Sequence, residues 1–162
     1  MRSSCTIRSA VPEDAASIAG LADELDQVHR VAHPELFRAR QPEREHGWFL
    51  ATLQDAATAV LVAERKEGER AVVGFLRVRD TETPSRGALA ARRFGLIDEL
   101  FVAVSSRREG IADDLLEAAE AWAVSRGLEA LEVTVWDFNQ PAQQLYDRWG
   151  FANLRRYLRK AL

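Results

Sequence analysis

The sequence has little that would mark a secreted, membrane-bound or nucleic-acid-binding protein. It contains one cysteine, Cys5, so no disulfide can form within the chain. No apolar run approaches the roughly 20 residues needed to cross a bilayer, and no apolar stretch follows the first residues as it does in a signal peptide. The 22 basic residues are outnumbered by 25 acidic ones, whereas nucleic-acid binders are usually basic. We therefore predict a cytoplasmic protein with neither a membrane nor a nucleic-acid partner.

Several common kinds of active site are also missing. There is no Gly-x-Gly-x-x-Gly, no glycine followed by the Lys-Ser/Thr of a nucleoside triphosphatase, and nothing that resembles a nucleophilic triad. His29 and His33 are four residues apart, but Pro34 follows them and no glutamate separates them as in a zinc protease helix. The sequence therefore predicts no metal site.

The hydrophobic pattern predicts one mixed α/β domain over residues 1–162. Ile18, Leu21 and Leu25 recur at helical spacing after Pro12, which suits a first helical turn, and His33-Pro34 ends that helix. Further helices are expected over residues 42–54, 110–126 and 141–149. The expected strands are Thr6–Arg8, Ala59–Glu64, Ala71–Val78, Phe94–Val104, Leu131–Trp136 and Phe151–Leu158. This order predicts a sheet that is mostly antiparallel and partly parallel, flanked by helices.

The stretch from Ile97 to Ala112 carries the first chemical signal. An apolar strand is followed by a short polar turn, then Gly110, and at once a helix. Unpaired main-chain N–H groups and the helix dipole at such a start favour a phosphate or diphosphate. Arg107 and Arg108 add cationic donors. On this stretch alone, a glycine that merely turns the chain into the helix is an equally good interpretation.

The stretch from Trp136 to Phe151 supplies the second signal. Asn139 lies just after the end of an expected strand, and Tyr146 follows it by seven residues on an expected helix, so the two face the same side. Together the stretches resemble the GCN5-related N-acetyltransferase (GNAT) family. Its cofactor motif matches here as Arg107-x-x-Gly110-x-Ala112. Its later motif matches at Asn139, Ala142, Leu145, Tyr146, Gly150 and Phe151.

This resemblance implies a GNAT fold with acetyl-CoA as co-substrate, held where two parallel strands, Phe94–Val104 and Leu131–Trp136, splay apart. Asn139 would bond to the cofactor, and Tyr146 would protonate the thiolate that leaves. The pantetheine arm would pair with the main chain of Phe101, Val102, Ala103 and Val104. The diphosphate would be held by Arg107, Arg108, Glu109, Gly110, Ile111 and Ala112.

The acceptor amine needs a base, and two acids are candidates. Asp98 and Glu99 are neighbours on a strand, so we expect them to point to opposite faces. The resemblance favours Asp98 as base or substrate contact and Glu99 as second choice, while an ordinary salt bridge stays open for each. It also suggests that His29, His33 and Phe37 overhang the acceptor cleft, with a core or loop role equally open.

The function implied is transfer of an acetyl group to a primary amine by direct attack. The amine could belong to a small molecule such as a polyamine or aminoglycoside, or to a protein; an N-terminal acetyltransferase and a non-catalytic acyl-CoA-binding module are alternatives. The sequence departs from the family at Val104, Arg108 and Glu109, where proline, glycine and a basic residue are common. Glu109 is expected to lower cofactor affinity. The choice between a monomer and a homodimer stays open.

Overall fold

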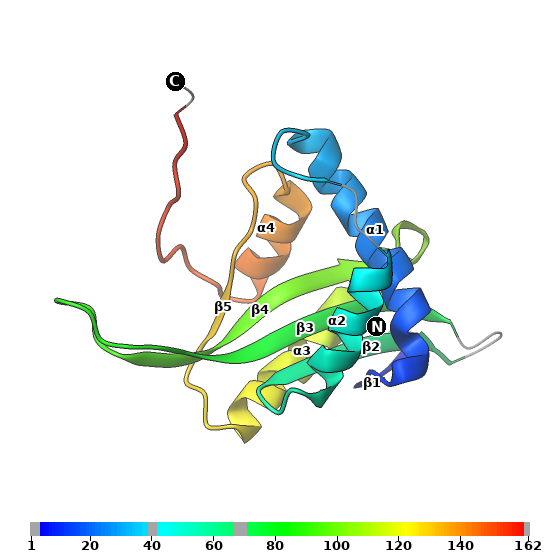
Figure 1. The fold of residues 1–162 in the computed structure, drawn as a ribbon, viewed down its shortest axis with the longest axis horizontal. Coiled ribbons are helices and arrows are strands. Elements are labelled where there is room, and N and C mark those ends of the chain that lie inside the picture. The colour runs from blue at the N-terminus through cyan, green and yellow to red at the C-terminus, as the bar shows by residue number, and fades with distance from the viewer. Residues whose placement is uncertain (1–3, 39–41, 67–70, 161–162) are drawn as a thin grey trace.

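A five-stranded sheet with helices on both faces forms the body of the protein (Figure 1). The computed structural model describes residues 4–38, 42–66 and 71–160, with only the backbone of residues 42–45. The strands are β1 (Cys5–Ser9), β2 (Thr58–Arg65), β3 (Val72–Thr83), β4 (Arg92–Val102) and β5 (Leu131–Val133). The α-helices are α1 (Ala15–Ala32), α2 (Pro42–Gln54), α3 (Ile111–Ser125) and α4 (Gln140–Arg148), and the 3₁₀ turns are η1 (Pro12–Asp14) and η2 (Val104–Ser106).

The sheet is mixed, as the sequence predicts. Its order is β1-β2-β3-β4-β5, with antiparallel pairing throughout except between β4 and β5, which are parallel. The parallel pairing is short and ends where Ile97 faces Val133. Beyond that point β4 continues to Val102, whereas β5 ends and the segment after it leads to α4. The two strands therefore separate at their carboxyl ends.

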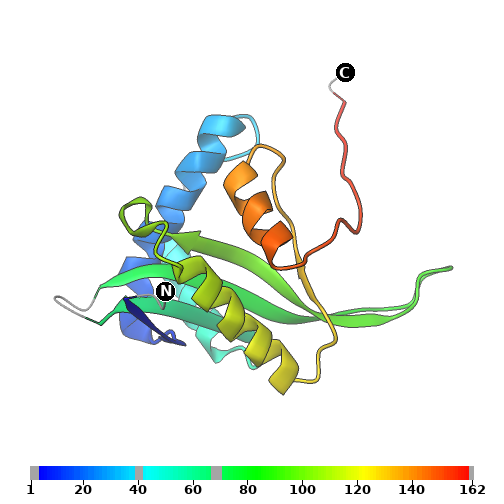
Figure 2. The same ribbon diagram turned by 180° about the vertical axis from the view of Figure 1, so that it is seen from behind.

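Two apolar layers hold the helices to the sheet. Helices α1 and α2 cover one face (Figure 1). There Ile18 and Phe49 pack with Phe75 and Phe101. Helix α3 crosses the opposite face with α4 beside it (Figure 2). Leu115 of α3 belongs to that second layer. Both faces are covered, so the strands are apolar on both sides near the centre of the sheet.

An ion pair ties the start of α1 to the sheet. Asp14, whose side chain is 7% exposed, accepts hydrogen bonds from the Arg8 guanidinium at 2.7 and 2.9 Å and from the Val11 N–H at 2.8 Å. Arg8 also donates to Glu64 of β2 at 3.0 Å. The Arg8 bond holds the pKa of Asp14 below its usual range. These contacts fix the direction in which the chain leaves β1.

The expected strand over Phe151–Leu158 is wrong. Residues 151–160 form no strand, and the chain runs away from the sheet toward its C-terminus (Figure 1). Leu154, Tyr157 and Leu158 are 68%, 98% and 87% exposed. A strand needs a neighbour to satisfy its main chain, and this segment pairs with none of the described strands. Among the described residues, no helix is long and apolar enough to span a membrane.

Candidate active site

A cavity of about 240 Å³ opens where β4 and β5 separate. Its walls come from α1, β4, the segment after β5, and α4. Six residues selected from the sequence line it together: His29, Phe37, Asp98, Glu99, Asn139 and Tyr146. This is the opening expected between the two parallel strands.

Tyr146 is the buried acid of the cavity. Its side chain projects from α4, is 8% exposed and packs edge-on against the Phe151 ring at 5.3 Å. Burial raises the pKa of Tyr146 to about 12, because a phenolate would lose its hydration. Within the described residues its hydroxyl makes no hydrogen bond. The phenol is therefore neutral at physiological pH and has a proton to donate.

Asn139 begins α4 and also faces the cavity. Its side-chain oxygen accepts a hydrogen bond from the Ala142 N–H at 3.2 Å, an N-cap that satisfies one of the free donors of the helix. The oxygen is thus used within the fold, and the amide nitrogen is left as a donor. The seven-residue spacing to Tyr146 puts both side chains on the cavity, in agreement with the helical spacing argument.

A β-bulge corrects the prediction for Asp98 and Glu99. The register between β3 and β4 shifts, so that Arg77 faces Glu99 while Val78 faces Ile97. Asp98 is the extra residue and lacks a partner position on β3. A bulge lets two successive side chains share one face. Asp98 and Glu99 accordingly both contact Arg77 and do not point to opposite faces.

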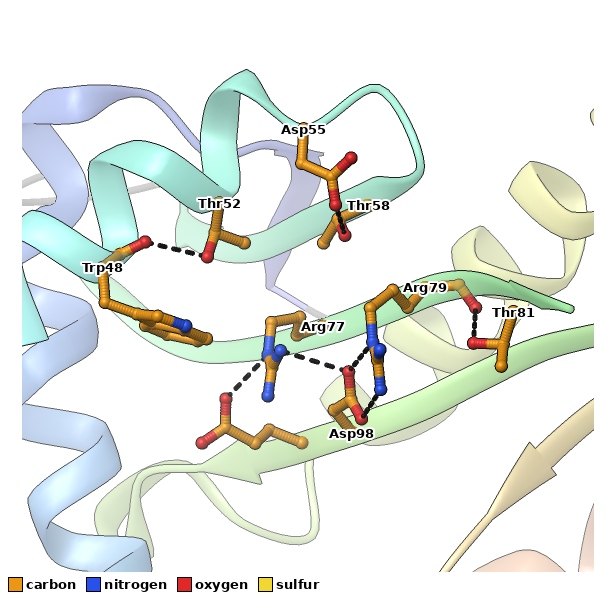
Figure 3. Close-up of polar contacts among 9 residues, drawn as sticks. Trp48, Thr52, Asp55, Thr58, Arg77, Arg79, Thr81 and Asp98 are labelled. Atoms are coloured by element: carbon orange, nitrogen blue, oxygen red, sulfur yellow. Dashed lines mark hydrogen bonds and ion pairs between the residues drawn. The ribbon is translucent and has the colours of Figure 1, made fainter. Parts of the chain in front are cut away.

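Two arginines of β3 hold these carboxylates (Figure 3). Arg79 donates to both oxygens of Asp98, at 2.9 and 3.1 Å, and Arg77 lies 3.1 Å from one of them. Arg77 also donates to Glu99 at 3.1 Å and stacks over the Trp48 ring of α2 at 4.6 Å. Sequence reasoning missed both arginines, although their i, i+2 spacing places them on one strand face.

The turn before α3 has the backbone of an anion cradle. Gly110 is its N-cap with φ +78°, a left-handed conformation that glycine adopts without strain. Arg108 has φ +68°, although it is not glycine. The main-chain N–H groups of Arg108, Glu109 and Gly110 donate to no acceptor in the described part of the chain. Arg107 turns back instead, and its Nε donates to the Val102 carbonyl at 3.2 Å.

Glu109 is held outside this cradle by a partner that sequence reasoning did not select. Arg65 at the end of β2 donates to both carboxylate oxygens, at 2.8 and 3.1 Å, and Ser4 donates to one of them at 3.2 Å. The Arg65 guanidinium lowers the pKa of Glu109. Arg65 also donates to the Ser106 hydroxyl at 2.9 Å. The charge expected to repel a diphosphate is therefore paired.

A cluster of rings closes the outer end of the cavity. His29 and His33 each contact Trp136 and Phe138, with ring centroids 5.5 to 6.2 Å apart. Phe37 contacts His29 at 4.9 Å and Trp136 at 5.2 Å. Of the three residues selected from the sequence, His29 and Phe37 line the cavity, whereas His33 does not and contacts Glu35 at 3.2 Å. Trp136 also lines the cavity. In the described ranges no three His, Cys, Asp or Glu side chains are grouped to hold a metal ion.

Comparison with known proteins agrees with this geometry. The sequence profile of the acetyltransferase (GNAT) family matches residues 22–151. An uncharacterized N-acetyltransferase of Bacillus subtilis, YhfO, is 27% identical over 145 residues, which are 90% of this chain and 88% of YhfO.

Solved structures show the same fold. A mutant of the BH1408 protein from Bacillus halodurans superposes with a TM-score of 0.89 at 24% identity, over 97% of this chain and 99% of that one. The aminoglycoside N-acetyltransferase AAC(6')-Iy, solved with CoA, superposes with a TM-score of 0.78 at 18% identity, over 100% and 97%. At these identities the likeness concerns the fold alone.

Proposed function

From the premise that this chain belongs to the acetyltransferase (GNAT) family and is an acyl-CoA-dependent acetyltransferase, we propose that it acetylates the primary amine of a small cationic molecule. The observation that carries the proposal is the cavity that opens where β4 and β5 separate. It is lined by a buried phenol, the Asn139 amide and several carboxylates. The amine would attack the thioester directly, without a covalent enzyme intermediate.

The turn before α3 fits the diphosphate of acetyl-CoA. The N–H groups of Arg108, Glu109 and Gly110 have no acceptor among the residues that the structure describes. With those of Ile111 and Ala112 in the first helical turn, they supply donors that an anion needs. The Arg107 side chain stabilises the turn by donating a hydrogen bond to the Val102 carbonyl. The main chain of Phe101–Val104 lies just before this turn, beyond the last residue of β4 that pairs with β5. This main chain would pair with the pantetheine amides, as an added strand does.

Tyr146 would supply the proton that the departing thiolate needs. A neutral phenol is the form that burial favours, and it lies in the same cavity as Asn139, whose amide would bond to the cofactor. Proton transfer by a positioned acid is worth about 10²–10⁴ in rate. Tyr146 therefore links binding in the cavity to release of the thiol.

Charge favours a cationic acceptor. Asp26, Asp98 and Glu99 all line the cavity, and a carboxylate-rich wall attracts an ammonium group. Arg77 and Arg79 offset part of that charge, and also hold Asp98 as a fixed acceptor. Small polyamines and aminoglycosides have the required amines and charge. A protein N-terminus is the second candidate acceptor, because the outer ring cluster offers apolar surface beside the acids.

A panel of acceptors tests the proposal. Calorimetry with acetyl-CoA comes first, followed by thiol release with polyamines, aminoglycosides, and peptides with a free N-terminus or a lysine. Turnover with a small cationic amine supports the proposal. Turnover with peptides alone would transfer the assignment to a protein acetyltransferase, and tight acetyl-CoA binding without turnover would indicate a non-catalytic acyl-CoA-binding module.

A further inference from the structure

We propose that His29 is the general base that deprotonates the acceptor amine. This inference rests on the proposed function and adds a residue to its mechanism. From the sequence alone, His29 is only a candidate substrate contact and Asp98 is the favoured base. The structure assigns the role differently, because a hydrogen bond fixes the tautomer of the His29 imidazole while arginines hold both oxygens of Asp98.

The tautomer follows from one contact on α1. The Nδ1 atom of His29 lies 3.0 Å from the main-chain carbonyl oxygen of Leu25, one helical turn earlier. A carbonyl oxygen can only accept a hydrogen bond, so Nδ1 must carry the proton. In the neutral ring the lone pair is then on Nε2. A base oriented by a second group in this way is the arrangement that general-base catalysis requires.

The surrounding rings hold the imidazole at the cavity wall. Phe37 stacks on His29 with centroids 4.9 Å apart and an interplanar angle of 27°. Phe138 meets it edge-on at 5.7 Å and Trp136 at 6.2 Å. These contacts restrict rotation of the ring, so the direction of Nε2 is set before a substrate arrives.

The carboxylates of the cavity are less suited to the task. Both oxygens of Asp98 accept from arginines, and Glu99 accepts from Arg77, so a proton taken there must displace an ion pair. Carboxylates are also weaker bases than imidazole, with reference pKa values of about 4 against about 6.5. Asp26, one turn before His29 on the same helix, lines the cavity as well. Its charge would stabilise the imidazolium that forms.

The protons balance as follows. Nε2 of His29 takes one proton from the ammonium group, and the freed nitrogen lone pair forms the C–N bond to the thioester carbonyl carbon. The nitrogen loses its second proton to solvent as the C–S bond breaks. Tyr146 gives its proton to the sulfur and is reprotonated from solvent, and His29 returns its proton to solvent. The net products are an amide, the free thiol and one proton.

Paired variants of the two histidines test the assignment. His29→Asn keeps an N–H that can reach the Leu25 carbonyl but has no basic nitrogen. We expect kcat/KM at neutral pH to fall at least about 100-fold, while the acetyl-CoA dissociation constant stays within about twofold. The loss should shrink at high pH, where the amine deprotonates in solution. His33→Asn is the matched control, because His33 belongs to the same ring cluster but does not line the cavity.

The control should keep the pH profile of the unmodified enzyme, whereas His29→Asn should lose one ionisation from it. The titratable groups that line the cavity together with His29 are Asp26 of α1, Asp98 and Glu99 of β4, and Tyr146 of α4. His33, which contacts Glu35, shares the ring partners Trp136 and Phe138 with His29. His29→Gln serves as a second variant, and unchanged circular dichroism and acetyl-CoA affinity show that each variant is folded.

Nitrogen-15 NMR of the free protein gives a readout independent of activity. It should show His29 in the Nδ1–H tautomer. An Nε2–H tautomer, or a His29→Asn enzyme with unaltered rate and pH profile, overturns the inference and leaves the proposed function standing. An unmodified protein that binds acetyl-CoA and acetylates no amine would overturn both.

Discussion

Burial gives Tyr146 its chemical character. An exposed tyrosine titrates near 10, but the cavity wall removes water from this phenol and raises its pKa to about 12. The neutral form is thus favoured over a wider range of pH than in solution. A group that must hold a proton until the thiolate departs benefits from this environment.

Removing the Tyr146 hydroxyl should separate chemistry from binding. We expect Tyr146→Phe to lower kcat at least about 100-fold, because the ring still fills its place beside Phe151 but no proton is available. The acetyl-CoA dissociation constant from calorimetry should remain nearly unchanged. A variant with the rate of the unmodified enzyme would remove Tyr146 from the mechanism.

The same residue predicts the alkaline side of the pH profile. An acid works only while protonated, so activity that depends on Tyr146 persists below its pKa of about 12 and is lost only as pH rises through it. With the best acceptor amine, kcat should therefore reach a plateau and show no decline up to pH 10. A falling limb centred between pH 8 and 9 in stable enzyme would contradict the assignment.

At the scale of elements, the turn before α3 depends on the end of β2. Arg65 reaches across to Glu109 and Ser106, so a strand far away in the sequence holds the cradle in place. The positive charge of Arg65 also offsets the negative charge of Glu109, which would otherwise repel a diphosphate. The sequence departure at Glu109 is thus compensated by a residue of another element.

Breaking the Arg65–Glu109 ion pair should weaken cofactor binding, and removing the charge of Glu109 as well should restore it. Arg65→Ala leaves the Glu109 charge unpaired near the cradle, and we expect the acetyl-CoA dissociation constant to rise on the order of tenfold. Arg65→Ala combined with Glu109→Gln should recover most of the loss. Calorimetry on the two single variants and the double variant measures the coupling. Equal losses in Arg65→Ala and in the double variant would show that the charge of Glu109 is irrelevant.

The sequence predicts these elements unevenly, for physical reasons. Gly110 and the Asn139–Tyr146 spacing are local signals, and the helix starts and the shared face that they predict are present. The bulge at Asp98 depends on how β4 registers with β3, and no local pattern encodes it. The strand expected at Phe151–Leu158 failed for a similar reason, since β-propensity does not supply a pairing partner.

At the scale of the whole molecule, carboxylates held by arginines set the response to acid. Arg8 lowers the pKa of Asp14, and Arg93 and Arg65 do the same for Asp80 and Glu109. A carboxyl whose pKa is lowered by folding stabilises the native state fully at pH values above its pKa in the unfolded chain, which is about 4. That stabilisation is lost as the pH falls through the lower pKa that the carboxyl has in the folded protein. The free energy of unfolding should therefore decline steeply below pH 4.

Asp14 should account for a measurable part of this decline. It is the most enclosed of these acids, so Asp14→Asn breaks a part-buried pair and should lower the free energy of unfolding at pH 7 by about 1–3 kcal/mol. The difference from the unmodified protein should narrow between pH 4 and pH 2. Asp23→Asn is the control, because Asp23 pairs with Arg30 at the surface and should cost under about 0.5 kcal/mol. Urea titrations at several pH values measure both.

The proposed mechanism requires acetyl-CoA to bind with its diphosphate at the N-terminus of α3 and its thioester in the cavity between β4 and β5. A crystal structure of the acetyl-CoA complex tests it most directly. We predict phosphate oxygens within hydrogen-bonding distance of the main-chain N–H groups of Glu109 and Gly110, with the sulfur beside the Tyr146 hydroxyl. A cofactor bound on another face, or a sulfur out of reach of Tyr146, would contradict the account.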